Sequence, residues 1–222
     1  MGFSKQWKEQ YRDNYHMSIW PWSKLVSLTM RMTDLRKAND DFAVMEVGCG
    51  AGANIPFFAA YTKTIYAIEG SAFIVNILKE RFPQIAKNIF TGDFAKEWPV
   101  DKQFDLIVDR AASTHNTTPA IKEYLVQAHK HLNDDGILII TDWFSTEHNC
   151  FSYGEPTDDE YTKSDYETGP FANVGNVHYF NRKLIAELIA DFELLHIEHL
   201  TSQVEGEDGA HACWNLVLKK RQ

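Results

Sequence analysis

The stretch that decides the fold is Val44-Met45-Glu46-Val47-Gly48-Cys49-Gly50-Ala51-Gly52, an apolar segment that leads directly into glycines at alternate positions. The apolar part predicts a buried strand at residues 42–47. The glycines predict a sharp turn against which a ligand can lie where any Cβ would clash. In open α/β sheets, ligands bind at this carboxyl end of a strand. Alone, the pattern fits a tight structural turn equally well.

Short apolar runs alternate with helical patterns downstream of this turn. We expect strands at 42–47, 64–68, 88–91, 104–109 and 136–141, and helices at 54–61, 71–82 and 119–132, the last with Thr118 as its N-cap. Such alternation produces β-α-β units. The nearly continuous hydrophobicity of the strands indicates a parallel sheet covered by helices on both faces.

The end of the chain predicts a different arrangement. Residues 181–191 predict a short amphipathic helix, and residues 192–200 and 212–219 predict two further strands. The polar segment between those two strands has no helical pattern, so it cannot provide the crossover that a parallel pair needs. We therefore predict an α/β fold with a seven-stranded, mostly parallel sheet whose last strand is antiparallel.

Polar residues end three further strands of the predicted sheet. Glu69 follows Gly48 by about 20 residues, where a carboxylate can accept hydrogen bonds from ribose hydroxyls. Asp93 is placed to accept from an adenine amino group, and Phe94 to cover the ring. The fourth strand, 104–109, ends in Asp109-Arg110. Together these strand ends indicate a nucleotide-like cofactor.

These motifs resemble those of class I S-adenosylmethionine (SAM)-dependent methyltransferases, most closely bacterial enzymes that act on small molecules. Asp135-Gly136 stands where that family usually has Pro-Gly before its fifth strand. The resemblance implies a Rossmann-like fold, SAM as cofactor, S-adenosylhomocysteine as product and in-line transfer of the methyl group to an oxygen or nitrogen nucleophile. The residues that it implies for cofactor binding are Glu46, Gly48, Cys49, Gly50, Gly52, Glu69, Gly70, Asp93, Phe94, Asp109 and Arg110.

The resemblance leaves the carboxylate of the cofactor to be bound by other groups. Backbone N–H groups of the glycine loop are the donors we expect there. For Arg110, pairing with Asp109 or with a substrate anion both remain open.

Candidate catalytic and substrate residues follow the fourth and fifth strands. His115 can act as a general base because the pKa of histidine lies near neutral pH. The residues proposed for catalysis are His115, Asp142 and His148, and those proposed for the methyl acceptor are Trp20, Trp22, His115, Trp143 and His178. Each tryptophan also fits an ordinary core position, and each histidine a packing role.

We expect one methyltransferase domain over residues 1–222. Residues 1–38 read as an N-terminal helical lid, and residues 40–142 as the SAM-binding core. Residues 143–180 are too long for a simple connection, which suggests an insertion that covers the substrate. Residues 181–222 supply the C-terminal helix and the antiparallel strand pair.

Composition excludes several classes of partner. The net charge of −9 argues against nucleic acid and anionic membranes, and no apolar run reaches about 18 residues. Cys49, Cys150 and Cys213 form no Cys-x-x-Cys pair, as expected for reduced thiols in the cytoplasm. No metal is expected, since Trp143 follows Asp142 where metal-dependent members of the family have an Asp-Asn pair. A small-molecule methyl acceptor is the expected partner, and a homodimer stays open.

Two alternative functions remain. An NAD(P)-dependent oxidoreductase would use a similar glycine loop, and Tyr179 and Lys183 have the Tyr-x-x-x-Lys spacing of short-chain dehydrogenases. A SAM-binding regulatory protein would carry the same cofactor motifs without turnover.

Overall fold

A seven-stranded sheet forms the centre of the computed structural model, which describes residues 6–13, 16–96, 98–206 and 208–221. Its strand order is β3-β2-β1-β4-β5-β10-β9. β1 pairs in parallel with β2 and β4, whereas β10 runs antiparallel to both β5 and β9. The strands are β1 (Val44–Val47), β2 (Ile65–Glu69), β3 (Ile89–Thr91), β4 (Phe104–Arg110), β5 (Leu132–Phe144), β9 (Phe192–Ser202) and β10 (His211–Lys220). The predicted sheet with its reversed strand is confirmed.

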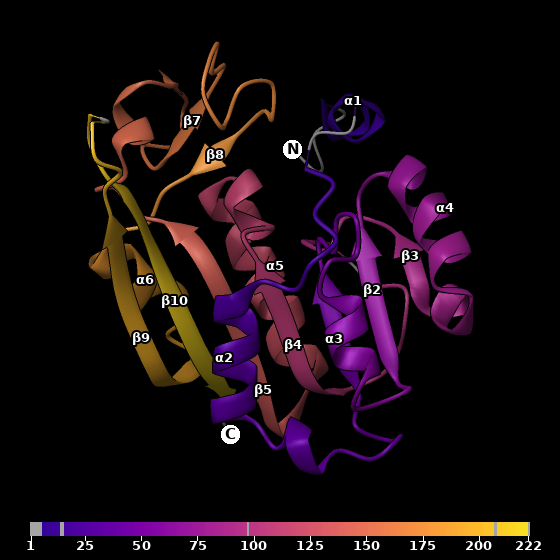
Figure 1. The fold of residues 1–222 in the computed structure, drawn as a ribbon. Coiled ribbons are helices and arrows are strands. Elements are labelled where there is room, and N and C mark those ends of the chain that lie inside the picture. Colours follow the sequence, from indigo (N-terminus) through magenta and orange to yellow (C-terminus); the bar gives the residue numbers. More distant parts are fainter. Residues whose placement is uncertain (1–5, 14–15, 97, 207, 222) are drawn as a thin grey trace.

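Helices cover both faces of the sheet, because successive residues of the inner strands point to opposite sides. Val44 belongs to the core beneath α2 (Ser23–Met32), α3 (Ile55–Ala59) and α4 (Ala72–Arg81). Met45 belongs to the core beneath α5 (Thr118–His131) and α6 (Arg182–Leu188). Figure 1 shows this layered arrangement. In the described part of the chain, none of the helices has the length and apolarity to cross a membrane.

The N-terminal segment is less helical than expected. It contains α1 (Gln6–Arg12), α2 and a short 3-10 helix, η1 (Leu35–Lys37). The expectation that residues 1–38 are helical is wrong for the segment between α1 and α2: His16 has a positive φ of 57°, and Trp22 is extended. Pro21 accounts for part of this break, since proline lacks the helical N–H and disfavours helix at the preceding residue. Residues 1–5, 14 and 15 lie outside the described residues.

Residues 143–180 form a small structure of their own. They contain η4 (Asn149–Ser152) and a three-stranded sheet of β6 (Glu155–Pro156), β7 (Thr162–Ser164) and β8 (Val177–His178). A separate cluster of buried side chains lies beneath, including Tyr166, Phe171 and Tyr179. The sequence did not predict this sheet, because strands of two or three residues show no period.

Asp159 of this insertion is bound to the start of α5. Its carboxylate accepts hydrogen bonds from the backbone N–H and the hydroxyl of Thr118. The predicted N-cap at Thr118 is therefore wrong: the helix begins at Thr118, and Thr117 in the N-cap position makes no side-chain cap bond. An acidic side chain from a distant segment supplies the acceptor and suits the positive end of the helix dipole.

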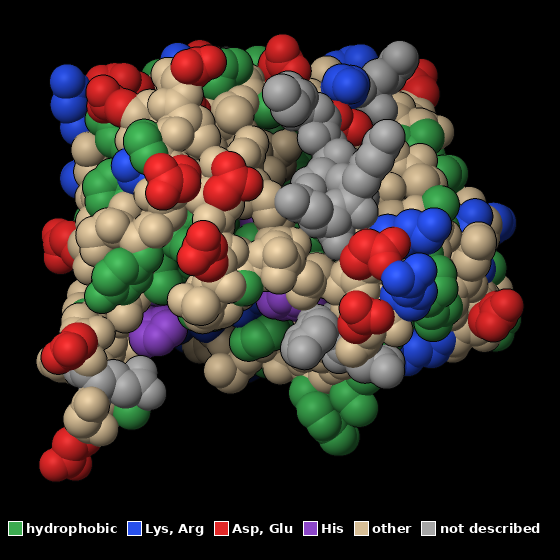
Figure 2. All heavy atoms as spheres, turned by 90° about the horizontal axis from the view of Figure 1, so that it is seen from above, with side chains coloured by type: hydrophobic (Ala, Val, Ile, Leu, Met, Phe, Trp, Pro, Cys, Tyr) green, Lys and Arg blue, Asp and Glu red, His purple; other side chains and the backbone are tan. Residues whose placement is uncertain are grey.

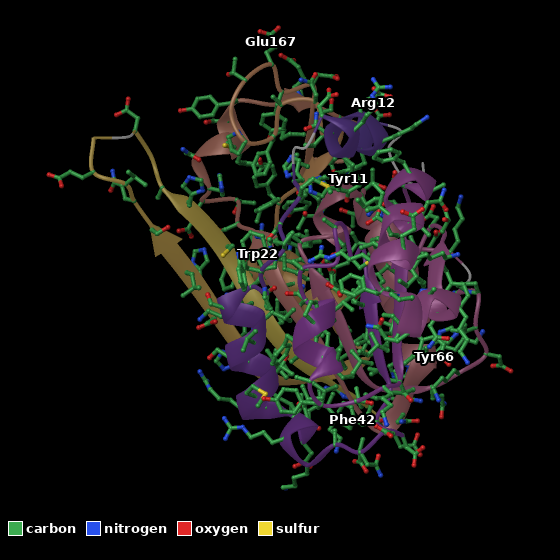
Figure 3. The ribbon with its side chains drawn as sticks, turned by 45° about the vertical axis from the view of Figure 1, so that its right-hand side comes forward. Tyr11, Arg12, Trp22, Phe42, Tyr66 and Glu167 are labelled. Carbon is green, nitrogen blue, oxygen red and sulfur yellow. The ribbon has the colours of Figure 1, made fainter. Side chains whose placement is uncertain are left out.

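Two segments lie over the carboxyl ends of the parallel strands. Figure 1 shows α1 on one side and the β7–β8 hairpin on the other, above the same edge of the sheet. α1 and the loop between β7 and β8 are in contact where Gln10 Nε2 donates to the backbone oxygen of Asn173 at 3.4 Å. Figure 3 shows Tyr11 on the side of α1 that faces the sheet. This edge is where the sequence places the cofactor.

Candidate active site

The glycine loop after β1 is shaped by close packing as well as by ligand access. Gly48 has a φ of +58°, and a Cβ there would lie 2.2 Å from the Cβ of Ala112. A Cβ on Gly52 would lie 2.7 Å from Leu78 Cδ2 and 2.8 Å from a ring carbon of Phe82. Gly52 thus closes the turn onto α4 and does not line the pocket described next.

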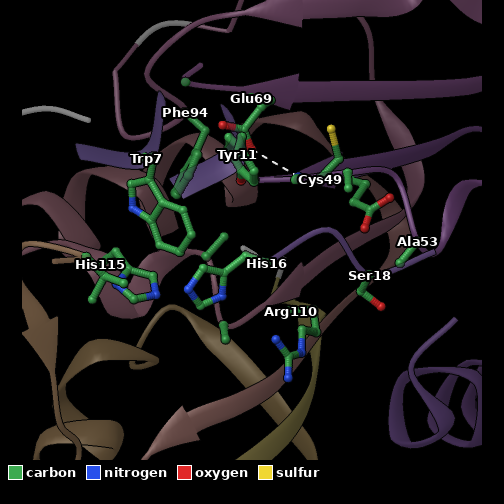
Figure 4. Close-up of a pocket in the computed structure, with 18 of the residues that line it drawn as sticks. Trp7, Tyr11, His16, Ser18, Cys49, Ala53, Glu69, Phe94, Arg110 and His115 are labelled. Atoms are coloured by element: carbon green, nitrogen blue, oxygen red, sulfur yellow. Dashed lines mark hydrogen bonds between the residues drawn. The ribbon is translucent and has the colours of Figure 1, made fainter. Parts of the chain in front are cut away.

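A pocket of ≈ 450 Å³ lies across the carboxyl ends of the parallel strands. This volume is within the usual range for small-molecule sites. Of the eleven residues predicted to bind the cofactor, the pocket is lined by Glu46, Gly48, Cys49, Gly50, Glu69, Gly70, Asp93, Phe94 and Arg110. Figure 4 shows Phe94, Glu69 and Cys49 on one side of the pocket and His115 and Arg110 on the other.

Glu69 is held at the end of β2 by backbone N–H groups. Its Oε2 accepts from Gly50 at 3.0 Å, and its Oε1 accepts from Ser71 at 2.9 Å. Burial raises the pKa of Glu69, against the effect of these hydrogen bonds. The hydroxyl of Tyr11 lies against Gly50 and Glu69, and burial together with the charge of Glu69 raises the pKa of Tyr11 well above its ordinary value.

Two further carboxylates of the pocket have an oxygen without a hydrogen-bond partner among the described residues. Glu46 Oε1 accepts from Asn54 Nδ2 at 2.8 Å, whereas its Oε2 is buried and unpaired, and burial raises the pKa of Glu46 to about 7. Asp93 Oδ1 accepts from the backbone of Ala95 at 3.1 Å, and Oδ2 has only the exposed ammonium of Lys96 at 3.4 Å. Buried acceptors of this kind fit a ligand that brings amino groups.

Several backbone donors of the glycine loop are already used within the fold. Gly48 and Cys49 donate to the backbone oxygen of Ile68, and Gly50 donates to Glu69. The expectation that backbone N–H groups of this loop bind the carboxylate of the cofactor stays a prediction, and it falls on the donors not used in this way. The guanidinium of Arg110 lines the pocket and offers an alternative donor for an anionic group.

Arg110 pairs with Asp142 rather than with Asp109. Its Nε lies 2.9 Å from Asp142 Oδ2, and its guanidinium lies 3.4 Å from the centre of a ring of Trp22. Asp142 has a φ of 60°, and its backbone N–H donates to Asn215 Oδ1 at 2.9 Å. Asp142, proposed as catalytic, is not among the residues that line the pocket and holds Arg110 in place instead.

Asp109 shapes the turn that carries Arg110 and His115. Its carboxylate accepts from the backbone N–H of Ala112 at 2.8 Å and from the backbone and hydroxyl of Ser113. It is fully buried, and burial raises its pKa to about 6. Because Asp109 does not line the pocket, its predicted contact with the cofactor is replaced by a role in positioning the turn.

Trp143 completes the same buried network. Its indole N–H donates to the Ser113 hydroxyl at 2.7 Å, and its ring stacks on Phe180 with centroids 4.0 Å apart. Trp143 is fully buried and lies outside the pocket lining, so the proposed wall residue is a core residue in this structure.

His115 and His148, both proposed as catalytic, do line the pocket. His115 Nδ1 lies 3.1 Å from the backbone oxygen of Asn176, and burial lowers the pKa of His115 to about 4. His148 Nδ1 accepts from the backbone N–H of Cys150 at 3.1 Å, and burial, with His211 nearby, lowers its pKa to about 4. Figure 2 shows histidine side chains in a hollow of the face that lies above the carboxyl ends of the parallel strands.

The remaining predicted residues divide between the pocket and other places. Trp22 lines the pocket, whereas Trp20 is 77% exposed and does not. His178 is buried in the insertion against Thr162 and Asp159. The dehydrogenase-like pair is separated, since Tyr179 is buried against Tyr166 while Lys183 points to solvent beside Glu187.

Several lining residues were not predicted, namely Trp7, Tyr11, His16, Asn54, Phe144, Phe171 and His211. The density of aromatic residues in the N-terminal segment is the signal that could have found Trp7 and Tyr11. Nothing in the pattern pointed to His211, which starts β10 far along the chain. Among the described residues, no group of three or more His, Cys, Asp or Glu side chains is placed to hold a metal ion. The three cysteines are free.

The chain is similar to known proteins over part of its sequence and over nearly all of its fold. Residues 44–136 match a family model described as "Methyltransferase domain". Over these residues, which make up less than half of the chain, the protein resembles methyltransferase domains. A stretch of 99 residues is 33% identical to protein-L-isoaspartate O-methyltransferase 1 of Nitrosospira multiformis, covering 43% of this chain and 42% of that protein. The chain therefore spans about two fifths of the length of this curated relative.

Two solved structures share the fold along nearly the whole chain. The N-methyltransferase NodS of Bradyrhizobium japonicum, in complex with S-adenosyl-L-homocysteine, has a TM-score of 0.63 at 15% identity, covering 99% of this chain and 100% of that one. A Rhodobacter sphaeroides protein described as a putative Zn-dependent alcohol dehydrogenase has a TM-score of 0.69 at 10% identity, with coverages of 99% and 100%. At such identities the likeness shows the fold alone. The predicted class I methyltransferase fold is confirmed, and SAM is the cofactor that this domain implies.

Proposed function

We propose that the protein transfers the methyl group of SAM to an oxygen or nitrogen of a small molecule. The observation that carries this proposal is the single pocket that joins the acidic ends of β1, β2 and β3 to a histidine-lined region beneath α1 and the insertion. We name these parts the cofactor half (Glu46, Gly50, Glu69, Asp93, Phe94 and Arg110) and the acceptor half (Trp7, His115, Phe144, His148, Phe171 and His211).

The cofactor half fits each polar group of SAM. Glu69 would accept hydrogen bonds from the ribose hydroxyls, and Asp93 from the adenine amino group beside the ring of Phe94. The unpaired Oε2 of Glu46 would receive the α-amino group, and Arg110 the α-carboxylate. The carboxylates of the cofactor half also attract the positively charged sulfur of SAM.

Bound SAM supplies an electrophilic methyl group, so the chain has to align the acceptor, exclude water and remove a proton where one must leave. We propose that residues 1–38 and 143–180 act as two lid segments for this purpose. Trp7 from the first and Phe171 from the second both line the acceptor half. His115 is the candidate for the proton, because it lies in that half on the turn after β4.

A small acceptor is favoured over a macromolecule. The pocket of ≈ 450 Å³ has to accommodate SAM as well as the acceptor. The net charge of −9 also disfavours nucleic acid. The isoaspartate methyltransferase that the chain resembles is matched over about two fifths of its length, so its methyl acceptor does not carry over to this chain.

The experiment combines binding and transfer. Calorimetry with SAM, S-adenosylhomocysteine, NAD⁺ and NADP⁺ should give micromolar binding of the first two only. Methyl-labelled SAM is then incubated with pooled small hydroxyl and amino compounds and with an isoaspartyl peptide. Label in a small molecule supports the proposal. Binding of a nicotinamide cofactor alone would identify an oxidoreductase, SAM binding without transfer a regulatory protein, and label in the peptide a protein methyltransferase.

A further inference from the structure

Among the described residues, the cofactor half of the pocket contains carboxylates and the acceptor half does not. This difference indicates which substrates fit the acceptor half. The carboxylates that line the pocket, Glu46, Glu69 and Asp93, all belong to the ends of β1, β2 and β3. The described residues of the acceptor half bring aromatic rings and imidazoles, with no carboxylate among them. A protonated amine would find no counter-charge there, whereas a hydroxyl compound would need none.

The tautomer of His115 is fixed by its partner. Its Nδ1 lies 3.1 Å from the backbone oxygen of Asn176, and a carbonyl oxygen can only accept. Nδ1 therefore carries the proton. In the neutral ring, Nε2 is then left with a lone pair. His115 can accept a proton from a ligand in the acceptor half.

The tautomer of His148 is the opposite one. Its Nδ1 receives the backbone N–H of Cys150 at 3.1 Å, and an amide N–H can only donate. Nδ1 must therefore hold a lone pair, and the proton of the neutral ring is on Nε2. His148 can donate a hydrogen bond to a ligand but cannot take its proton at Nδ1.

Aromatic rings enclose the space between these two histidines. Phe144 lies close to both, its ring centroid 6.4 Å from that of His115 and 5.8 Å from that of His148. Trp7 packs edge-on against His115 at 4.8 Å, and Phe171 lies 4.7 Å from Phe144. Figure 4 shows Trp7 beside His115. Such walls suit a planar ring.

From the proposed methyltransferase function and this geometry we infer that the methyl acceptor is an aryl hydroxyl compound with a second oxygen. Nε2 of His115 takes the proton of the reacting hydroxyl, and Nε2–H of His148 donates to the second oxygen. This assigns opposite roles to two histidines: His115 is the base, and His148 orients the substrate.

The protons and electrons balance without another reactant. The aryl oxygen forms its bond to the methyl carbon, and the carbon–sulfur bond breaks with its electron pair on sulfur. The hydroxyl proton moves to His115, which becomes an imidazolium and then releases the proton to water. The positive charge that was on sulfur thus leaves as a proton.

The weak basicity of His115 agrees with an aryl hydroxyl. Burial lowers the pKa of His115 to about 4, with the charges of His16 and Arg110 adding to the shift. A phenol has a pKa of about 10, like tyrosine, whereas an aliphatic hydroxyl is nearer to water, at about 15.7. The more acidic hydroxyl is the one that such a base can assist.

The first test measures the tautomers directly and needs neither SAM nor turnover. Nitrogen-15 NMR of the imidazoles at pH 7.5 should show the proton on Nδ1 in His115 and on Nε2 in His148. Spectra of the His115→Asn and His148→Gln variants assign the signals. Reversed tautomers, or a protonated ring at either position, would overturn the inference.

The second test measures transfer from labelled SAM to catechol, phenol, 2-hydroxyacetophenone and benzylamine. We expect label in an aryl hydroxyl compound, faster for catechol or the ketone than for phenol, and none in benzylamine. Label in the amine alone, or in no aryl hydroxyl compound, would contradict the inference. If the protein binds no SAM by calorimetry, the proposed function itself fails, while the tautomers remain measurable.

Variants separate the two roles. His115→Asn should lower kcat by at least about 100-fold and leave the affinity for S-adenosylhomocysteine unchanged. His148→Phe should raise the KM of catechol about tenfold, and His148→Gln, which keeps a donor, should recover most of that loss. His129→Asn, on α5 outside the pocket, is the matched control. Equal effects of His148→Phe and His148→Gln would reduce His148 to a packing role.

Discussion

The cofactor half and the acceptor half are built in different ways. Every residue of the cofactor half except Arg110 lies between Glu46 and Phe94, on the ends of three neighbouring strands. The acceptor half draws on α1, the turn after β4, the end of β5, the insertion and the start of β10. Two carboxylates of the cofactor half, Glu69 and Asp93, accept hydrogen bonds from backbone N–H groups at the ends of the strands. The residues of the acceptor half come from segments that cover the sheet and pack together through their side chains. On the proposed assignment, cofactor recognition is a property of the core, and acceptor recognition a property of the segments added to it.

The largest effect should come from the glycine loop. Gly48→Ala places a Cβ 2.2 Å from that of Ala112 at a φ of +58°, so strain and overpacking together should cost about 4 kcal/mol of stability. Binding of S-adenosylhomocysteine should fall more than about 100-fold. Urea denaturation and calorimetry measure the two losses.

Gly169→Ala is the matched control for this change. Gly169 also has a positive φ, +81°, but a Cβ there would have nothing within 4 Å. Backbone strain alone should then cost about 1 kcal/mol, with cofactor binding intact. Equal losses for both variants would show that the contact with Ala112 is unimportant.

The second prediction concerns the buried carboxyl of Glu46. Its pKa is raised from 4.5 to about 7, so the wild-type protein loses stability as the pH rises through that window. Glu46→Gln removes the ionisation and keeps an acceptor for Asn54. The variant should gain about 3 kcal/mol over wild type at pH 8 and nothing below about pH 4.5, at 1.36 kcal/mol per pKa unit.

Urea denaturation at pH 4.5 and pH 8 measures this difference. Glu80→Gln, at an exposed position of α4, is the control and should show no dependence on pH. The Glu46→Gln variant should also bind S-adenosylhomocysteine less tightly, because stability and ligand binding compete at this carboxyl. A variant less stable than wild type at pH 8 would show that the carboxylate is compensated in the fold.

The third prediction is confined to ligand binding in the cofactor half. Glu69→Ala leaves two ribose hydroxyls poorly paired and should weaken binding of S-adenosylhomocysteine by about 1–3 kcal/mol. Calorimetry measures it, with Glu155→Ala, exposed on the insertion, as control. Unchanged affinity in Glu69→Ala would remove this residue from the cofactor site.

The smallest effect should separate two tryptophans of the same loop. Trp22 lies over the guanidinium of Arg110, whereas Trp20 is exposed. Trp22→Ala should weaken binding of S-adenosylhomocysteine by about 0.5–1 kcal/mol through the loss of the cation–π contact, and Trp20→Ala should leave it unchanged. A loss in both variants would point to the loop as a whole.

Local patterns were sufficient to predict the core of this fold. The strand before Gly48 is continuously apolar, and the segment between β9 and β10 is too short for a crossover, so both sheet and reversed strand could be predicted. The strand ends with Glu69 and Asp93 could be predicted too, because parallel strands bring their carboxyl ends to one edge.

Contacts between distant segments could not be predicted in this way. Asp142 bonds to Arg110 because a left-handed residue near the end of β5 turns its carboxylate toward β4. The side chain of Trp143, the next residue along β5, is buried in the core instead. Likewise, the insertion caps α5 through Asp159, where the local sequence offered only a threonine. These pairings depend on side-chain directions that a one-dimensional pattern does not contain.

The position of α1 has a kinetic consequence. One helix places Tyr11 against Glu69 and Trp7 against His115, so it covers both halves of the pocket at once. Neither ligand can then pass beneath α1 without a movement that also exposes the other. On the proposed role of this segment as a lid, entry of both substrates and departure of both products share one rate of opening, and a cross-link between positions 10 and 173 should slow all four steps together.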